Sequence, residues 1–234
     1  MRIFAALSAF AFIAAALHAD EPPAARLASE NTIAWEKKSF RCERPARGCY
    51  ISRCCELSLE IFTRDEPGTD IREVRAVGEF DAPPAVVFSV LTDYAHFTEY
   101  MPYTVGGQLL WREGNEEVVW GMVDPPFVSR RDWVTRSQFI MNGPGGIYRT
   151  SWWPEESMGP APQSGVVRLK KNTGSWTLEP ISGGARTRAT YFIATDPGLA
   201  LPIFVMKAIS GEGIPDLFEA LRKRAATQLK TEQR

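Results

Sequence analysis

Histidine is scarce in this chain: of 234 residues, only His18 and His96 are histidines. His18 falls in an apolar leader segment, so the rest of the chain has a single imidazole. Histidine provides the general base of most nucleophilic triads and the ligands of most catalytic zinc sites, so both kinds of site are disfavoured. His96 follows a predicted helix, where a surface or loop position is expected. Catalysis by serine, tyrosine or carboxylate groups stays open.

Excess basic charge is also missing, because the formal net charge is −1 and the sequence pI is about 6.2. Proteins that bind nucleic acid usually carry a strongly basic face, so that class is not expected. A glycine-rich phosphate loop is absent as well. The run Asn142–Gly146 lacks the lysine and the helix that such a loop requires, and it predicts a turn.

Long apolar runs are limited to one, at the N-terminus. Arg2 precedes an apolar stretch from Ile3 to Leu17, which is followed by small residues and then by Asp20. This order predicts a secretory signal peptide over residues 1–19, and therefore a periplasmic or secreted protein. The run is shorter than the roughly 20 residues that span a bilayer. An uncleaved membrane anchor is the alternative.

All four cysteines lie close together, in a predicted leader and Cys-rich loop over residues 20–56. In an oxidising compartment an even, clustered set favours two disulfides, and neighbouring cysteines rarely bond to each other. Each of the adjacent pair is therefore expected to bond with one of the earlier two. A four-thiolate zinc site is the alternative, although the repeated C-x2-C spacing is missing. The residues concerned are Cys42, Cys49, Cys54 and Cys55.

Most of the remaining chain alternates in the manner of β-strands. Residues 57–63 and 71–80 predict a hairpin, and a long antiparallel meander follows. Its strands are expected at 108–112, 116–123, 130–140, 147–153, 166–171, 175–179 and 186–195, with Asn172–Gly174 among the separating turns.

Helical spacing occurs in two places. Asp81 is expected to cap a helix of about three turns. A long C-terminal helix carries one apolar stripe, with a kink or hinge where Gly211, Gly213 and Pro215 interrupt it. The stripe consists of Leu201, Phe204, Val205, Ala208, Ile214, Leu217, Phe218, Leu221 and Ala225.

Four stretches, in this order, resemble the START (StAR-related lipid-transfer) family of the helix-grip superfamily. They are Leu59–Arg64 with Arg72–Glu79, Asp81–Asp93, Pro125–Val134, and Gly174–Pro180 with Thr190–Pro202. The resemblance implies an α+β helix-grip fold over residues 57–231. In that fold a curved antiparallel sheet wraps around a long C-terminal α-helix and encloses an apolar cavity.

The strand at 130–140 is expected to carry the polar end of the site. Arg131, Trp133, Thr135, Ser137 and Phe139 share one face, which the family pattern places inward. Arg131 would then meet a carboxylate or phosphate; an ion pair with Asp132 or at the surface is the alternative. Sterol-binding relatives carry an arginine at the place of Ser137, so an acyl or isoprenoid lipid is expected rather than a sterol.

The expected function is therefore lipid binding and transfer, with one lipid ligand, transient membrane contact, a monomeric state and no cofactor or metal. The alternatives are a cyclase- or hydratase-type enzyme and an interaction module whose cavity is filled by its own aromatic side chains. The predicted ligand-binding residues are Trp120, Met122, Phe127, Arg131, Trp133, Thr135, Ser137, Trp152, Tyr191, Phe204 and Leu217.

Overall fold

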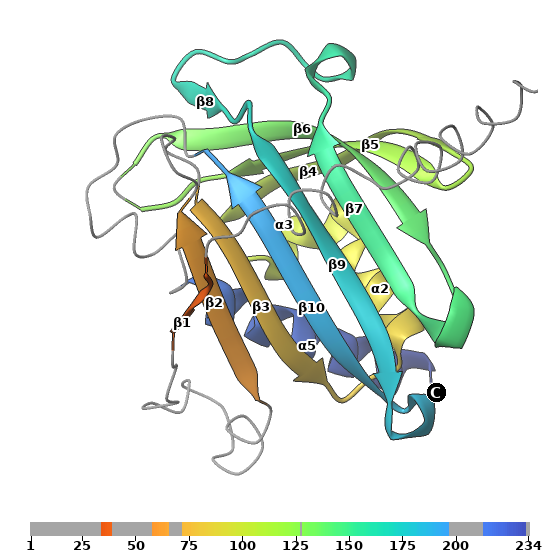
Figure 1. Cartoon of the computed structure of the whole chain (residues 1–234). Coiled ribbons are helices and arrows are strands. Elements are labelled where there is room, and N and C mark those ends of the chain that lie inside the picture. Colours follow the sequence, from red (N-terminus) through yellow and green to blue (C-terminus); the bar gives the residue numbers. More distant parts are fainter. Residues whose placement is uncertain (1–33, 39–57, 66–71, 127, 197–212, 233–234) are drawn as a thin grey trace, which may run out of the picture.

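The computed structural model describes residues 34–38, 58–65, 72–126, 128–196 and 213–232. Its central feature is one curved sheet with helices on its concave side (Figure 1). The strands are β1 (Glu36–Lys38), β2 (Leu59–Asp65), β3 (Arg72–Phe80), β4 (Thr104–Glu113), β5 (Glu116–Val123), β6 (Arg130–Ile140), β7 (Tyr148–Pro154), β8 (Val166–Arg168), β9 (Asn172–Ile181) and β10 (Arg186–Thr195). The helices are α2 (Pro84–Leu91), α3 (Phe97–Tyr100) and α5 (Gly213–Glu232), with short turns η1 (Tyr94–His96), η2 (Pro144–Gly146), η3 (Glu156–Met158) and η4 (Ser182–Gly184).

The strands follow the order β1-β2-β3-β10-β9-β7-β6-β5-β4. The predicted hairpin is confirmed as β2 and β3, and β3 also pairs with β10, so an early strand of the chain lies beside its last strand. The predicted antiparallel meander is confirmed with one exception. β8 pairs in parallel with the first residues of β6.

One predicted turn is wrong. Residues Asn172–Gly174 form the beginning of β9 and pair with Ile193–Thr195 of β10. A β-carbon at Gly174 would overlap the indole of Trp152 and the carbonyl oxygen of Phe192. This glycine therefore permits close packing inside the sheet instead of ending a strand.

The first helix begins later than predicted. Its N-cap is Pro83, which makes no side-chain capping bond, and α2 covers only eight residues. Asp81 is exposed and forms an ion pair with Arg186 at 2.8 Å, so its carboxylate is used between elements and not at the helix end. Pro84 fits the first helical position, where an N–H group has no partner within the helix.

The apolar stripe of the C-terminal helix is confirmed for the described part. Phe218 packs against Phe80, Trp176 and the backbone of Gly78. The described helix runs from Gly213 to Glu232, with Pro215 in its first turn. The residues directly before Gly213 lie outside the described ranges, so the kink or hinge expected there stays a prediction. Buried positions of the stripe are Ile214, Phe218, Leu221 and Ala225. Residues 201–208 of the predicted stripe, and Gly211, lie outside the described residues.

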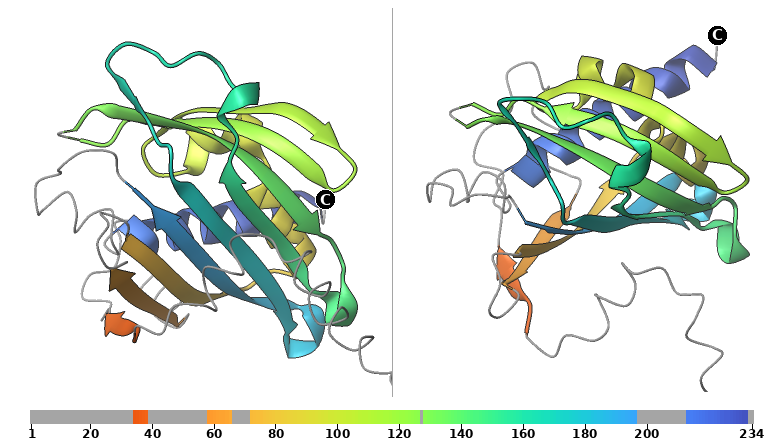
Figure 2. Two further views of the ribbon diagram at one scale, coloured as in Figure 1. Left: turned by 45° about the horizontal axis from the view of Figure 1, so that its top comes forward. Right: turned by 90° about the horizontal axis from the view of Figure 1, so that it is seen from above.

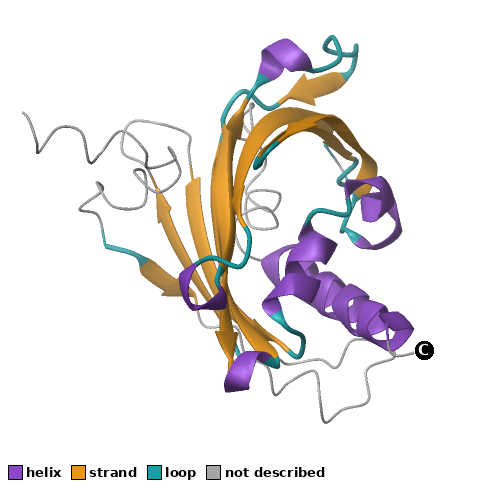
Figure 3. Cartoon of the chain, turned by 90° about the vertical axis from the view of Figure 1, so that its right-hand side faces the viewer, coloured by secondary structure: helices purple, strands orange, loops and turns teal. Residues whose placement is uncertain are grey.

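Figures 2 and 3 show the layers of the molecule. The sheet curls strongly toward its β4 edge, and α2, α3 and α5 lie on the concave side. α2 contacts α5, while α3 contacts β4 and α5. The concave face of the sheet, meaning the face toward α2 and α5, is therefore the inner face of the fold, as the helix-grip prediction requires.

Candidate functional site

The side chains of β6 divide between the two faces as the alternation predicts. Phe139 packs edge-on against Phe88 of α2, with ring centroids 5.8 Å apart, which places its face on the concave side. By alternation along this regular strand, Arg131, Trp133, Thr135 and Ser137 lie on the same side. The inward assignment of this set is confirmed.

The opposite, convex face of β6 carries paired charges. Asp132 accepts two hydrogen bonds from Arg168, both at 2.8 Å, and one from the Trp120 indole at 3.0 Å. Burial raises the pKa of Asp132, but the hydrogen bonds from Arg168 and Trp120 outweigh it and hold the pKa below its ordinary value. The alternative that Arg131 pairs with Asp132 is therefore wrong, because the two point to different faces.

Two predicted ligand-binding residues are also on the convex face. Trp120 and Met122 lie opposite Val134 and Asp132 in the β5–β6 register, so they point away from the side of Arg131. The Trp120 indole packs against Gly106 of β4 and donates to Asp132. The prediction that these two side chains line the same space as Arg131 is wrong.

The concave face has two regions of different character. Over β2, β3, β9 and β10 it is covered by an apolar core cluster formed with α2 and α5, which reaches β6 only at Phe139. That cluster includes no residue of β5, and none of Arg131, Trp133, Thr135 or Ser137. We call the concave side of β5 with these four residues of β6 the β5–β6 inner face.

Among the described residues, the cation of this inner face has no acidic partner. Arg131 is 4% exposed, and its side chain donates one hydrogen bond, from Nη1 to the carbonyl oxygen of Ser129 at 2.5 Å. Its Nε is buried without a hydrogen-bond partner. Burial lowers the pKa of Arg131, but an arginine remains protonated in proteins. A positive charge is thus buried here, and within the described part of the chain its hydrogen-bond partner is a carbonyl oxygen.

The neighbours of Arg131 on the inner face are neutral. Trp133 packs against Gly121 of β5, where a β-carbon would overlap the indole ring. Thr135 and Ser137 are both 5% exposed. Within the described part of the chain neither hydroxyl has a hydrogen-bond partner, so both can bond to a ligand.

Predicted aromatic residues continue the concave face beyond β6. The ring of Tyr191 lies 6.2 Å from Trp152 and 4.5 Å from Trp176, centroid to centroid. Trp152 donates from its indole to Asn172 at 3.2 Å. Burial raises the pKa of Tyr191 above its ordinary value. Tyr191 and Trp152 thus lie on the predicted side, as does Leu217, which packs against the core cluster.

Some predicted residues cannot be placed. Phe127, Phe204, the four cysteines and the predicted signal peptide lie outside the described residues. Their predicted roles stay predictions.

A buried carboxylate on the inner face was missed by the sequence analysis. Glu117 of β5 is fully buried and lies opposite Ser137 in the register. It accepts hydrogen bonds from Tyr94 of η1 and from Arg112 of β4. Burial, and then the negative charge of Glu117, raise the pKa of Tyr94 well above its ordinary value. The only signal in the sequence is a glutamate at an inward position of a strand, which cannot be recognised before the register is known.

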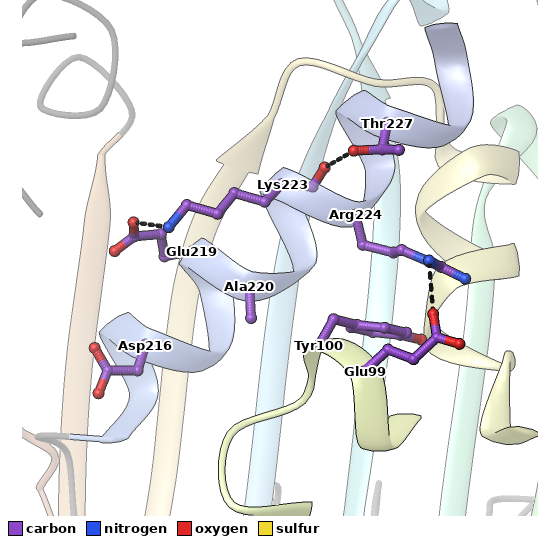
Figure 4. Close-up of a pocket in the computed structure, with 8 residues that line it drawn as sticks. All are labelled: Glu99, Tyr100, Asp216, Glu219, Ala220, Lys223, Arg224 and Thr227. Atoms are coloured by element: carbon purple, nitrogen blue, oxygen red, sulfur yellow. Dashed lines mark hydrogen bonds and ion pairs between the residues drawn. The ribbon is translucent and has the colours of Figure 1, made fainter. Parts of the chain in front are cut away.

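A pocket of about 570 Å³ lies elsewhere, between α3 and the outer side of α5 (Figure 4). Arg224 pairs with Glu99 at 3.3 Å and with Asp93 at 3.0 Å, and its guanidinium lies over the Tyr100 ring. The pocket is lined by Glu99, Tyr100, Asp216, Glu219, Ala220, Lys223, Arg224 and Thr227. None of these was predicted to bind a ligand. The contacts of Arg224 with Asp93, Glu99 and Tyr100 link α5 to the segment of α3, and we call them the α3–α5 clamp.

The single histidine among the described residues, His96, lies at the surface. His96 is exposed and lies 2.6 Å from Asp93, and the hydrogen bond to that carboxylate raises its pKa. Across the described ranges no group of three or more His, Cys, Asp or Glu side chains is placed to hold a metal ion. In the same ranges no helix is both long and apolar enough to cross a lipid bilayer.

Comparison with protein families gives one match. Residues 80–222 match the family described as polyketide cyclase/dehydrase and lipid transport. The match covers more than half of the chain and lies within the predicted domain of residues 57–231. A search of curated protein sequences found no match.

Solved structures with the same fold include StAR-related lipid-transfer proteins. One from Xanthomonas axonopodis has a TM-score of 0.65 at 23% identity, covering 82% of this chain and 98% of its own. Human STARD10 has a TM-score of 0.69 at 16% identity, covering 89% and 79%. Human StAR-related lipid transfer protein 5 has a TM-score of 0.68 at 16% identity, covering 87% and 91%. The predicted helix-grip fold of START type is confirmed.

Proposed function

Because this chain belongs to the polyketide cyclase/dehydrase and lipid transport family, we propose that it binds one amphiphilic lipid beneath the β5–β6 inner face and carries it between membranes. The apolar part of the lipid would lie along the concave face, and its polar end would meet the polar residues of β6. The protein would then act as a carrier that shields the lipid from water.

One observation carries this proposal: the apolar core stops at Phe139, while the inner face continues with Arg131, Trp133, Thr135 and Ser137. Arginine, indole and hydroxyl groups on the inner side of a fold are costly unless they have partners. A cavity lined by aromatic side chains with a few polar groups is typical of a small-molecule site. A lipid would supply apolar contacts along this face and a polar partner for Arg131.

The affinity would come mainly from the apolar part. Burial of each methylene group contributes about 0.8 kcal/mol, so an acyl or isoprenoid chain stabilises the complex more than any single polar contact. The polar residues would orient the lipid.

Native mass spectrometry of the full protein purified from its own host tests the carrier. A stoichiometric lipid adduct that is transferred to acceptor vesicles supports the proposal. An intact protein that stays empty and refuses lipids would favour the interaction module and overturn it.

A second candidate is an enzyme that uses the same space, since the half-buried phenol of Tyr94 is hydrogen-bonded to the buried carboxylate of Glu117 at the inner face. Groups of this kind can act as general acid and base. Turnover of a bound compound that is lost in both Tyr94→Phe and Glu117→Gln, with binding retained, would support the enzyme. Release of the bound compound unchanged would support the carrier.

We also propose that the protein works outside the cytoplasm, with the signal peptide removed after Ala19 and the four cysteines in two disulfides. This rests on the sequence pattern alone. N-terminal sequencing of the exported protein should begin at Asp20, and alkylation without reductant should label none of the four thiols. Labelling of two or more would overturn the disulfides.

A further inference from the structure

The carrier proposed above leaves the chemical class of its lipid open, and Arg131 narrows it. Resting on that proposed function, we propose that the lipid is a monoanionic amphiphile, with a carboxylate such as that of a fatty acid, and that Arg131 binds this carboxylate. The inference rests on the burial of Arg131 and on the charges around it.

Other deeply buried arginines of the chain show what Arg131 lacks. The side chain of Arg64 is 1% exposed and pairs with Glu73. The side chain of Arg168 is 6% exposed and pairs with Asp132. Arg131 is 4% exposed, yet within the described residues it forms no ion pair, and its Nε has no partner. Because an uncompensated buried charge is costly, Arg131 is expected to bind an anion.

The charge of that anion follows from its surroundings. The inner-face neighbours Trp133, Thr135 and Ser137 are neutral, and so are Val123 opposite Arg131 and Val119 opposite Thr135. The carboxylate opposite Ser137 is Glu117, which is paired with Arg112. The other described cation on the concave side of β4 to β6 is Arg112, which is already paired with Glu117. A neutral lipid would leave the guanidinium uncompensated, and a dianionic phosphate monoester would bring a second charge for which the described inner face has no free cation. One negative charge matches one arginine.

The shape of the guanidinium favours a carboxylate. A planar arginine can donate two parallel hydrogen bonds to the two oxygens of a carboxylate. A phosphodiester also carries one negative charge, but it brings a polar substituent beyond the phosphate. The test separates these two sources of negative charge.

The experiment uses the full chain, freed of bound lipid, with palmitic acid and cetyl alcohol as probes that share their apolar chain and differ in the head. Phosphatidylglycerol vesicles supply the phosphodiester, and phosphatidylcholine vesicles supply a zwitterion. Binding is followed by tryptophan fluorescence and by titration calorimetry. The wild type is expected to bind palmitic acid at least about tenfold more tightly than cetyl alcohol, as charge-assisted hydrogen bonds imply.

Two variants of one strand form a matched pair. Arg131→Gln removes the inner cation, and it is expected to abolish the preference by weakening palmitic acid about 10- to 100-fold while cetyl alcohol is little changed. Arg136→Gln removes a cation from the convex face, where Glu116 and Glu155 pair with it, and it should keep the preference. Equal weakening of both probes by Arg131→Gln would show a structural role and overturn the inference.

Stability gives an independent readout. If Arg131 is a ligand-binding group, the lipid-free Arg131→Met variant should unfold at a temperature at least equal to that of the wild type, because an unpaired buried charge is removed. A large loss of Tm would contradict this. If the variants do not fold, the relative affinity of the wild type for palmitic acid and cetyl alcohol still tests whether the protein prefers an anionic head group.

The remaining outcomes separate the two proposals. Equal affinity of the wild type for palmitic acid and cetyl alcohol overturns the anionic head while leaving the carrier intact. Preference for phosphatidylglycerol over palmitic acid overturns the carboxylate. If none of the probes binds, the proposed carrier function is overturned, and the proposed carboxylate ligand is overturned with it.

Discussion

Trp133 of β6 packs so closely against Gly121 of β5 that a β-carbon on the glycine would overlap the indole ring. Both residues are on the concave face, and they are cross-strand partners in the sheet. The wide indole fits onto this face only because its partner has no side chain. The pair therefore sets the position of the largest aromatic group next to Arg131.

The first prediction is that Gly121→Ala both destabilises the fold and weakens lipid binding. Crowding of this kind typically costs about 1–3 kcal/mol, because the indole must leave its preferred position. Urea unfolding measures the loss. Trp133→Phe in the Gly121→Ala background should recover part of it, since the smaller ring leaves room for the new methyl group. Additive effects of the two changes would contradict a direct contact.

The second prediction concerns the buried pair on the convex face. Asp132→Asn should lower the free energy of unfolding by about 3 kcal/mol, because it leaves the Arg168 guanidinium buried without a charge partner. Asp124→Asn is the matched control. Asp124 also pairs with an arginine, Arg130, but both side chains are exposed, so a change below about 0.5 kcal/mol is expected.

The same pair also predicts a dependence on pH. The pKa of Asp132 is lowered in the fold, so its stabilisation is present above the carboxylate pKa of the unfolded chain, about 3.9, and is lost as pH falls through the folded value. The difference in stability between wild type and Asp132→Asn should therefore shrink below about pH 4. A difference that stays constant down to the lowest pH at which the protein folds would contradict the assignment.

The third prediction concerns the half-buried phenol of Tyr94. Its pKa is raised in the fold, so its contribution is complete below the pKa of an unfolded tyrosine, about 10, and is lost as pH rises through the folded value. Tyr94→Phe should cost about 2 kcal/mol at neutral pH, since the hydrogen bond to the Glu117 carboxylate disappears. It should also reduce the fall in stability above about pH 10. Chemical unfolding at neutral pH and at several alkaline pH values measures both effects. If the stability of Tyr94→Phe falls above about pH 10 as steeply as that of the wild type, the predicted pH dependence is wrong.

The sequence predicted the strands and the helix stripe because each is a local pattern. Alternation along residues 130–140 sorts the side chains of β6 into two sets without knowledge of any other strand. The placement of Ile214, Phe218 and Leu221 on one buried stripe follows from helical spacing in the same way.

The errors arise where two distant segments had to be related. Alternation gives two faces for β5 but does not say which face joins that of Arg131, and only the pairing of Val123 with Arg131 puts Trp120 on the convex side. The same register brings Glu117 opposite Ser137. Asp81 was expected to cap the helix, but its carboxylate pairs instead with Arg186, which lies 105 residues further along the chain. Local propensity cannot anticipate a partner at such a distance.

The last prediction concerns the clamp between α3 and α5. Arg224 reaches from α5 to Asp93 and Glu99 and lies over the ring of Tyr100, so Arg224→Met should loosen the segment of residues 93–100. Because the Arg224 side chain is 28% exposed, the global stability should fall by no more than about 1 kcal/mol. The effect should instead appear as faster hydrogen exchange of η1 and α3, because regions held by few contacts open locally. Lys223→Met is the control, since among the described residues Lys223 pairs with Glu219 of its own helix alone, and its side chain is 66% exposed. Equal acceleration by both variants would mean that the clamp does not hold α3, and that the pocket beside it is an ordinary surface groove.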